Sequence, residues 1–173
     1  SIKSKEAADM ARQQEVSIHV KNADRLNQEI LDRSLRKVEQ IQKELPQVEK
    51  LIKQYNGVGT QFMAEPFIDK ERHTSLTADG DTDPKTGEVR LNAVMLLSKD
   101  HSTEDIVKTS ERVGTWKERF NDRDRKVSST APEHTVVHEY GHIIHLALCC
   151  KEYGKDRARI ISDYSVGGRA GNR

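Results

Sequence analysis

The segment from Thr135 to Cys150 constrains the fold of this chain most, because it places the pentapeptide His138-Glu139-Tyr140-Gly141-His142 inside an apolar frame. With histidine counted as neutral, Glu139 is the only charged residue between Thr135 and Ile144. A carboxylate in an apolar stretch needs a partner, since burying an unpaired charge is costly. The segment therefore predicts a packed helix whose glutamate belongs to a polar site such as a metal site.

The H-E-x-x-H spacing of the pentapeptide indicates which metal. Residues four apart share one face of a helix, so His138 and His142 can both bind one Zn²⁺ ion, with Glu139 beside it as a general base. Zinc lowers the pKa of water to about 7, and the glutamate takes the proton as a carbonyl is attacked. We therefore predict His138 and His142 as metal ligands, Glu139 as a catalytic residue and Zn²⁺ as the cofactor. The alternative is a chance pentapeptide on a buried helix.

A catalytic zinc ion normally has three protein ligands, so the motif lacks one. The extended three-histidine motif of the metzincins would need a histidine at the position of Leu148, which excludes that class. His145 lies on the same helical face as the two motif histidines, but one helix cannot easily wrap three side chains around a tetrahedral ion, so we expect a supporting or core role. Cys149 and Cys150 are adjacent in the sequence, which disfavours a disulfide between them and indicates packing residues near a helix end.

Composition narrows the function classes. The chain has 173 residues, of which 34% are hydrophobic and 33% charged, so we expect one domain with a small core. A net charge of +1 offers no general attraction to nucleic acid or to an anionic membrane. No apolar stretch approaches the roughly 20 residues of a membrane span. We therefore predict a peptide or protein substrate, no nucleic acid and no membrane span.

The N-terminal third reads as helical up to about residue 55. One helical face is formed by residues spaced three, four or seven apart: Leu31, Leu35, Val38, Gln42, Leu45 and Ile52. Pro46 suits the first turn of a new helix, so we expect a break near Leu45. Residues 1–15 are expected to form a protruding helix that tethers the chain to a larger protein or assembly. The start at Ser1 and the glycine-rich end also favour a piece of a longer protein.

The middle of the chain changes to strand and turn patterns. We expect a strand within 60–68, a polar loop over 79–87, a strand within 88–97 and a helix near 104–110. In zinc peptidases a strand placed like 88–97 often lies along the rim of the cleft, where its edge can pair with an extended substrate. A capping box, Thr130 to Glu133, predicts the start of the motif helix, which we expect to continue to about Cys149.

The loop over 79–87 also suggests a calcium site, since Asp79, Asp81 and Asp83 alternate in it. An EF-hand loop would need an acidic residue at its twelfth position, which is Arg90 here. The EF-hand match therefore fails.

The motif helix together with Ile161-Ser162-Asp163-Tyr164-Ser165-Val166-Gly167-Gly168 and the residues after it resembles the lethal-factor-like zinc metallopeptidases. That family includes bacterial toxin domains and zincin domains attached to phage head proteins. The resemblance implies an α+β zincin fold, with a small mixed sheet on the motif helix and N-terminal helices. It also implies that Tyr164 faces the metal and can hydrogen-bond the oxyanion of the tetrahedral intermediate.

In the family the third zinc ligand is a glutamate on a helix that follows the Ser-x-Tyr stretch. The present sequence ends where that helix would begin, so the third ligand is expected beyond Arg173, with Asp163, Glu152 or His145 as substitutes within the chain. We accordingly divide the chain into an N-terminal helical segment, residues 1–34, and a zincin-like metallopeptidase domain, residues 35–173.

Two functions follow from this sequence. The first is a zinc-dependent endopeptidase that hydrolyses peptide bonds, with Glu139 as its general base. The second is a catalytically weak or inactive zincin shell that serves as a structural or interaction module, for example in a phage head protein. The sequence leaves the compartment open between a secreted, toxin-like setting and a phage or intracellular one.

Overall fold

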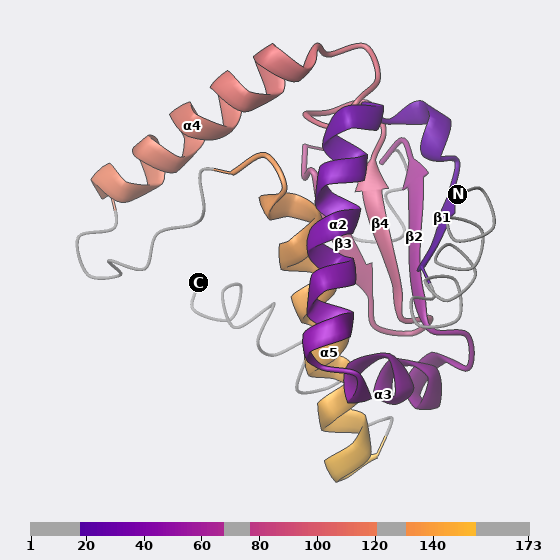
Figure 1. The fold of residues 1–173 in the computed structure, drawn as a ribbon. Helices are drawn as coiled ribbons and strands as arrows, with labels where there is room; N and C mark the ends of the chain where they lie inside the picture. Colours follow the sequence, from indigo (N-terminus) through magenta and orange to yellow (C-terminus); the bar gives the residue numbers. More distant parts are fainter. Residues whose placement is uncertain (1–17, 68–76, 121–130, 155–173) are drawn as a thin grey trace, which may run out of the picture.

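The computed structural model describes residues 18–67, 77–120 and 131–154, which form a mixed α+β fold (Figure 1). The sequence prediction of this class is confirmed. In chain order the elements are β1 (Ile18–Lys21), the 3-10 helix η1 (Ala23–Arg25), α2 (Gln28–Glu44), α3 (Gln47–Asn56), β2 (Thr60–Glu65), β3 (Gly80–Asp83), β4 (Glu88–Asn92), α4 (Thr103–Phe120) and α5 (His134–Tyr153).

The four strands form one sheet in the order β1-β2-β4-β3. β1, β2 and β4 run parallel, whereas β3 pairs antiparallel with β4 as the outer arm of a hairpin. The strands predicted within 60–68 and 88–97 are confirmed as β2 and β4. The prediction that the strand within 88–97 lies at the rim of the cleft is wrong, because β4 lies between β2 and β3 in the sheet. Among the described strands, β3 is the outermost on this side of the sheet, whereas the sequence pattern indicates a loop there.

The physical reason for this error is the composition of β3. Its sequence Gly-Asp-Thr-Asp has no apolar residue, so it lacks the alternation that marks a half-buried strand. The strand is instead specified by its pairing with β4, where Gly80 lies opposite Leu91 and Thr82 opposite Val89. Such long-range pairing is not visible in local sequence.

The helical interpretation of the N-terminal third is correct only in part. Residues 18–21 form β1, whose side chains alternate between half-buried and exposed, and this strand pairs with β2. The prediction of helix there is therefore wrong, since tertiary pairing overrides local propensity. The predicted boundary between residues 34 and 35 falls inside α2, and the division of the chain stays a prediction. The protruding helix expected for residues 1–15 lies outside the described residues.

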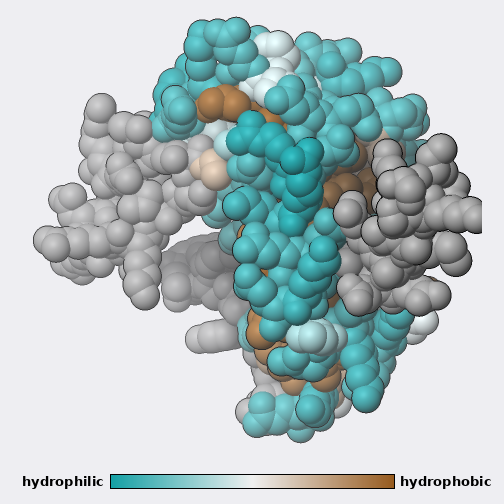
Figure 2. Space-filling view, viewed as in Figure 1, coloured by the Kyte–Doolittle hydropathy of each residue, from teal (hydrophilic) through white to brown (hydrophobic). Residues whose placement is uncertain are grey.

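The break between α2 and α3 is confirmed. α2 ends at Glu44, and Pro46 is the N-cap of α3, as its fixed φ and missing N–H favour. At the other end of α2, the side chain of Asn27 accepts a hydrogen bond of 3.0 Å from the Ile30 N–H and so caps the helix. The face of α2 turned to the viewer in Figure 2 is hydrophilic, because its apolar residues point to the core.

The helices α2, α3 and α5 pack together on one side of the sheet, while α4 projects away from them (Figure 1). The strands contribute Phe62, Ala64, Val89 and Leu91 to the core between sheet and helices. From α5 the core receives Val136, Tyr140, Ile143, Leu146 and Ala147. Within the described ranges, no helix is both long and apolar enough to cross a membrane.

The motif helix α5 begins later and ends later than predicted, at His134 and Tyr153. Its N-cap is Glu133, whose side chain makes no capping hydrogen bond. The carboxylate of Glu133 instead accepts a hydrogen bond of 2.8 Å from Arg33 Nε on α2. The glutamate of the predicted capping box therefore joins two helices, and Thr130 lies outside the described residues.

Candidate metal centre

Two faces of α5 carry different residues, although the whole helix is apolar in composition. The fully buried residues Val136, Tyr140 and Ile143 form the face that packs on the sheet and on α3. Each residue of a helix advances about 100° around the axis, so His138 and His142 lie on the opposite side. His138 is exposed and His142 is half-buried. The helix thus presents two imidazoles to the outside while its other face closes the core.

The two motif histidines converge on one point. Their Nε2 atoms lie 3.1 Å apart. Two imidazoles on one tetrahedral zinc ion, with Zn–N bonds near 2.0–2.1 Å, place their nitrogens about 3.3 Å apart. The donor atoms of His138, Glu139 and His142 all lie within 4.8 Å of one another. The residues therefore fit a zinc ion.

Glu139 lies on the flank of α5, between the buried face and the histidine face, and only 8% of its surface is exposed. Its carboxylate accepts a hydrogen bond of 2.8 Å from the Thr82 hydroxyl on β3. A buried carboxylate needs such donors, because its desolvation is otherwise uncompensated. The apolar frame of the pentapeptide therefore contains a polar contact that crosses from α5 to the sheet.

Tyr140, the central residue of the pentapeptide, belongs to the core and not to the metal centre. Its side chain is fully buried, and this burial raises the pKa of its phenol. The side chains of Gln42 and Thr60 lie beside its hydroxyl and partly offset this rise in pKa. The residue between the two motif histidines thus serves the packing of α5.

The remaining predicted site residues are not brought to this cluster. Tyr164 and Asp163 lie outside the described residues. Glu152 is exposed in the last turn of α5, ten residues after His142 and thus about 15 Å along the helix axis, too far to bind the same ion. His145 is half-buried on α5 and is not a member of the cluster. The third ligand therefore stays a prediction.

Sequence reasoning missed two neighbours of the cluster. His134 lies one turn before His138, with ring centroids 5.4 Å apart, and its spacing of four residues could have indicated this. Thr82 is 57 residues away from Glu139 in sequence, and no local signal connects them. Only the fold brings β3 to the flank of α5.

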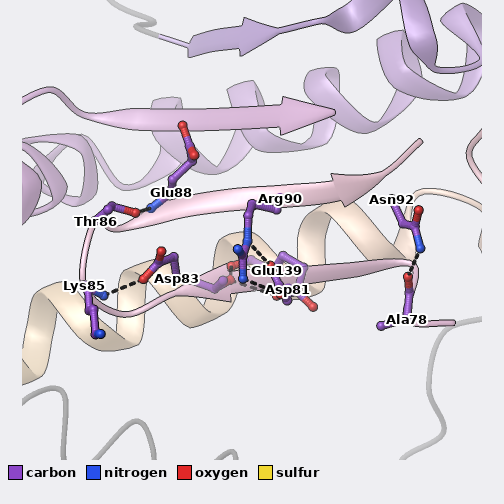
Figure 3. A network of polar contacts seen from close by, with 10 residues as sticks. Ala78, Asp81, Asp83, Lys85, Thr86, Glu88, Arg90, Asn92 and Glu139 are labelled. Carbon is purple, nitrogen blue, oxygen red and sulfur yellow. Dashed lines mark hydrogen bonds and ion pairs between the residues drawn. The ribbon is translucent and has the colours of Figure 1, made fainter. Parts of the chain in front are cut away.

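The three aspartates of the expected loop accept hydrogen bonds from other groups of the protein. Asp81 accepts two hydrogen bonds of 2.6 Å from Arg90, the residue that broke the calcium-loop match (Figure 3). Burial lowers the pKa of the Arg90 guanidinium, but the hydrogen bonds and charge of Asp81 outweigh it, so the pKa is raised. Asp79 Oδ1 accepts from the N–H of Leu96, and Asp83 Oδ1 from that of Lys85. These contacts order the β3–β4 hairpin.

The two cysteines near the end of α5 are free thiols, as predicted. Cys149 is buried, and this burial raises the pKa of its thiol. They belong to the packing of the helix end.

Comparison of the chain with known protein families, with curated proteins and with solved structures gives no match.

Proposed function

We propose that the chain is a zinc-dependent metallopeptidase with a zincin-like fold. The observation that supports this most is the pair of imidazole nitrogens 3.1 Å apart on the outer face of α5, with the Glu139 carboxylate beside them. A helix that exposes two converging histidines next to a buried carboxylate has the donor set of an H-E-x-x-H zinc site.

His138 and His142 would hold the zinc ion, which when bound supplies a Lewis acid that polarises a carbonyl and lowers the pKa of water. Glu139 would accept the proton of the attacking water and deliver it to the leaving amine nitrogen. Its place on the flank of the helix suits this role, because the Thr82 hydrogen bond limits where the carboxylate can turn. The partial exposure of the histidine pair leaves room for a substrate carbonyl.

The substrate would be an extended peptide or protein segment. Among the described strands, β3 is the outermost on the side of the sheet that contacts α5, and a peptide that lies along it would pass the metal centre. Pairing of an extended substrate with a sheet edge provides main-chain hydrogen bonds that do not depend on sequence. In this proposal β3, and not the strand within 88–97, pairs with the substrate.

The likeness to lethal-factor-like peptidases would add two further groups. Tyr164 would hydrogen-bond the developing oxyanion, and a third ligand, either a glutamate beyond Arg173 or Asp163 within the chain, would complete the ligand set. Both stay predictions of the sequence.

Zinc content and peptide cleavage test the proposal together. We expect about one zinc ion per chain by elemental mass spectrometry, lost in the His142→Ala variant. Glu139→Gln should keep the zinc and lose cleavage of a fluorescence-quenched peptide library, because the amide cannot accept the proton. Full cleavage by this variant would contradict the mechanism.

The inactive zincin shell is a separate outcome of the same experiment. A chain that binds zinc, loses it in His142→Ala and cleaves no peptide of the library would favour a structural or interaction module. A chain without zinc would exclude a closed site within these 173 residues.

A further inference from the structure

The contact between Thr82 and Glu139 joins two parts of the molecule that the motif alone does not relate. The Thr82 Oγ1 atom lies 2.8 Å from Glu139 Oε2 and 3.2 Å from the main-chain oxygen of the same residue. A hydroxyl has one proton, so it donates to one of these oxygens at a time, and the charged carboxylate is the stronger acceptor. The Thr82 hydroxyl oxygen thus contacts both the carboxylate and the main-chain oxygen of Glu139.

Gly80 makes this contact sterically possible. A Cβ atom at this position would lie 3.1 Å from Glu139 Cγ and 3.2 Å from Thr135 Cγ2, closer than side chains normally pack. Gly80 and Thr82 point to the same face of β3, because side chains alternate along a strand. The missing side chain of Gly80 therefore lets the strand approach α5 closely enough for the Thr82 hydroxyl to reach the carboxylate.

Asp81, the residue between Gly80 and Thr82, holds β3 in place from the opposite face of the strand. Asp81 forms a two-point ion pair with Arg90 of β4, and the Arg90 side chain is only 8% exposed (Figure 3). A two-point arginine–carboxylate pair fixes geometry as well as adding energy. The register of β3 against β4, and hence the height of Thr82 along α5, is fixed by this pair and by the strand pairing.

We infer that Thr82 is a positioning residue, which holds the carboxylate of Glu139 beside the histidine pair through its hydroxyl. This hydrogen bond gives the carboxylate a partner on β3, and its loss would leave Glu139 with one contact fewer to keep it beside the histidines. This inference rests on the proposed function for its catalytic consequence. The positioning itself is a property of the folded chain and can be measured without turnover.

Thr82→Val removes the hydroxyl and keeps the shape of the side chain. We expect kcat for peptide cleavage to fall roughly 10- to 100-fold, the usual effect of removing a residue that orients a metal-site group. KM and zinc content should stay unchanged, and Thr82→Ser should restore kcat. Thr86→Val is the matched control, because Thr86 is an exposed residue of the same hairpin whose hydroxyl contacts the Glu88 N–H.

Crystal structures of the wild-type chain and of Thr82→Val give the readout that does not need activity. We expect the Glu139 carboxylate to leave its wild-type position in Thr82→Val and to keep it in Thr86→Val. If Thr82→Val does not fold, Gly80→Ala provides the second test, since its methyl group should lengthen the distance from Thr82 to Glu139 and lower kcat.

The outcomes separate the two proposals. A carboxylate that stays in place in Thr82→Val, or a kcat that does not fall, would overturn the positioning role. A loss of stability with unchanged kcat of the folded fraction would do the same, since it indicates a merely structural contact. A wild-type chain that cleaves nothing would refute the peptidase proposal, and the position of the carboxylate would still decide the role of Thr82.

Discussion

Replacing Glu49 by alanine is a direct test of how α3 is joined to the sheet. Glu49 is a residue of α3 that is only 9% exposed, and its side chain contacts α2 and the start of β2. Its carboxylate accepts hydrogen bonds from the Thr60 N–H at 3.1 Å, from the Thr60 hydroxyl at 2.6 Å and from Gln42 Nε2 at 3.1 Å. Glu49→Ala leaves these three donors without this acceptor inside the protein.

The expected loss of unfolding free energy is about 2–5 kcal/mol, because a buried neutral donor left without an acceptor costs about 1–3 kcal/mol. Only the two Thr60 donors lose their acceptor outright, because Gln42 Nε2 keeps its contact of 3.2 Å with the Thr60 hydroxyl oxygen. The variant also avoids the desolvation of the carboxylate, which lowers the net loss. Since small domains are stable by only about 5–15 kcal/mol, this change should be plainly visible. Glu49→Gln keeps the shape but replaces one acceptor oxygen by a donor, and should cost about 1–3 kcal/mol.

Urea denaturation followed by circular dichroism measures these differences, provided that the transition is two-state and its slope is unchanged. Glu44→Ala is the control, because Glu44 is an exposed glutamate at the end of α2, where the expected change is within about 0.5 kcal/mol. A loss below about 1 kcal/mol in Glu49→Ala would refute the reasoning, since it would mean that water or other groups replace the carboxylate without cost.

Two further predictions concern glycine and cysteine positions. Gly59→Ala should destabilise the chain by several kcal/mol in the same urea assay, because its positive φ costs about 1–2 kcal/mol for alanine and the new Cβ would clash with the Glu49 carboxylate. Gly57→Ala has the positive φ without the clash and should cost clearly less, so equal losses would contradict this. In a Cys150→Ser background, iodoacetamide should alkylate Cys149 more slowly in the folded chain than in urea, with a rate that still rises above pH 9, because burial raises the pKa of the thiol above its ordinary 9.0; mass spectrometry follows the reaction, and a plateau below pH 9 would exclude a raised pKa.

The sequence could predict the local elements because their signals are local. Pro46 marks the start of α3, and the apolar residues of β2 and β4 mark these strands. The spacing of His138 and His142 predicts that both lie on one helical face, and the structure has their Nε2 atoms 3.1 Å apart. These features depend on helical and strand periodicity, which short stretches of sequence contain.

The errors about the sheet concern contacts between distant residues. The local sequence favours a helix at β1 and a loop at β3, because a strand of four residues is specified by its neighbour in the sheet and not by its own composition. For the same reason β4 was expected at the edge of the sheet, although β3 lies there.

By itself, the sequence determined the helix of the candidate site, its two histidines and the presence of a carboxylate between them. Only the tertiary structure decided that this carboxylate is buried against β3, because the contact of Glu139 with Thr82 joins residues 57 positions apart. It also decided that Arg90, which excluded a calcium loop in the sequence, pairs with Asp81 and orders the same hairpin. Periodicity determines which side chains share a face of a helix, whereas the tertiary fold determines which group packs against that face.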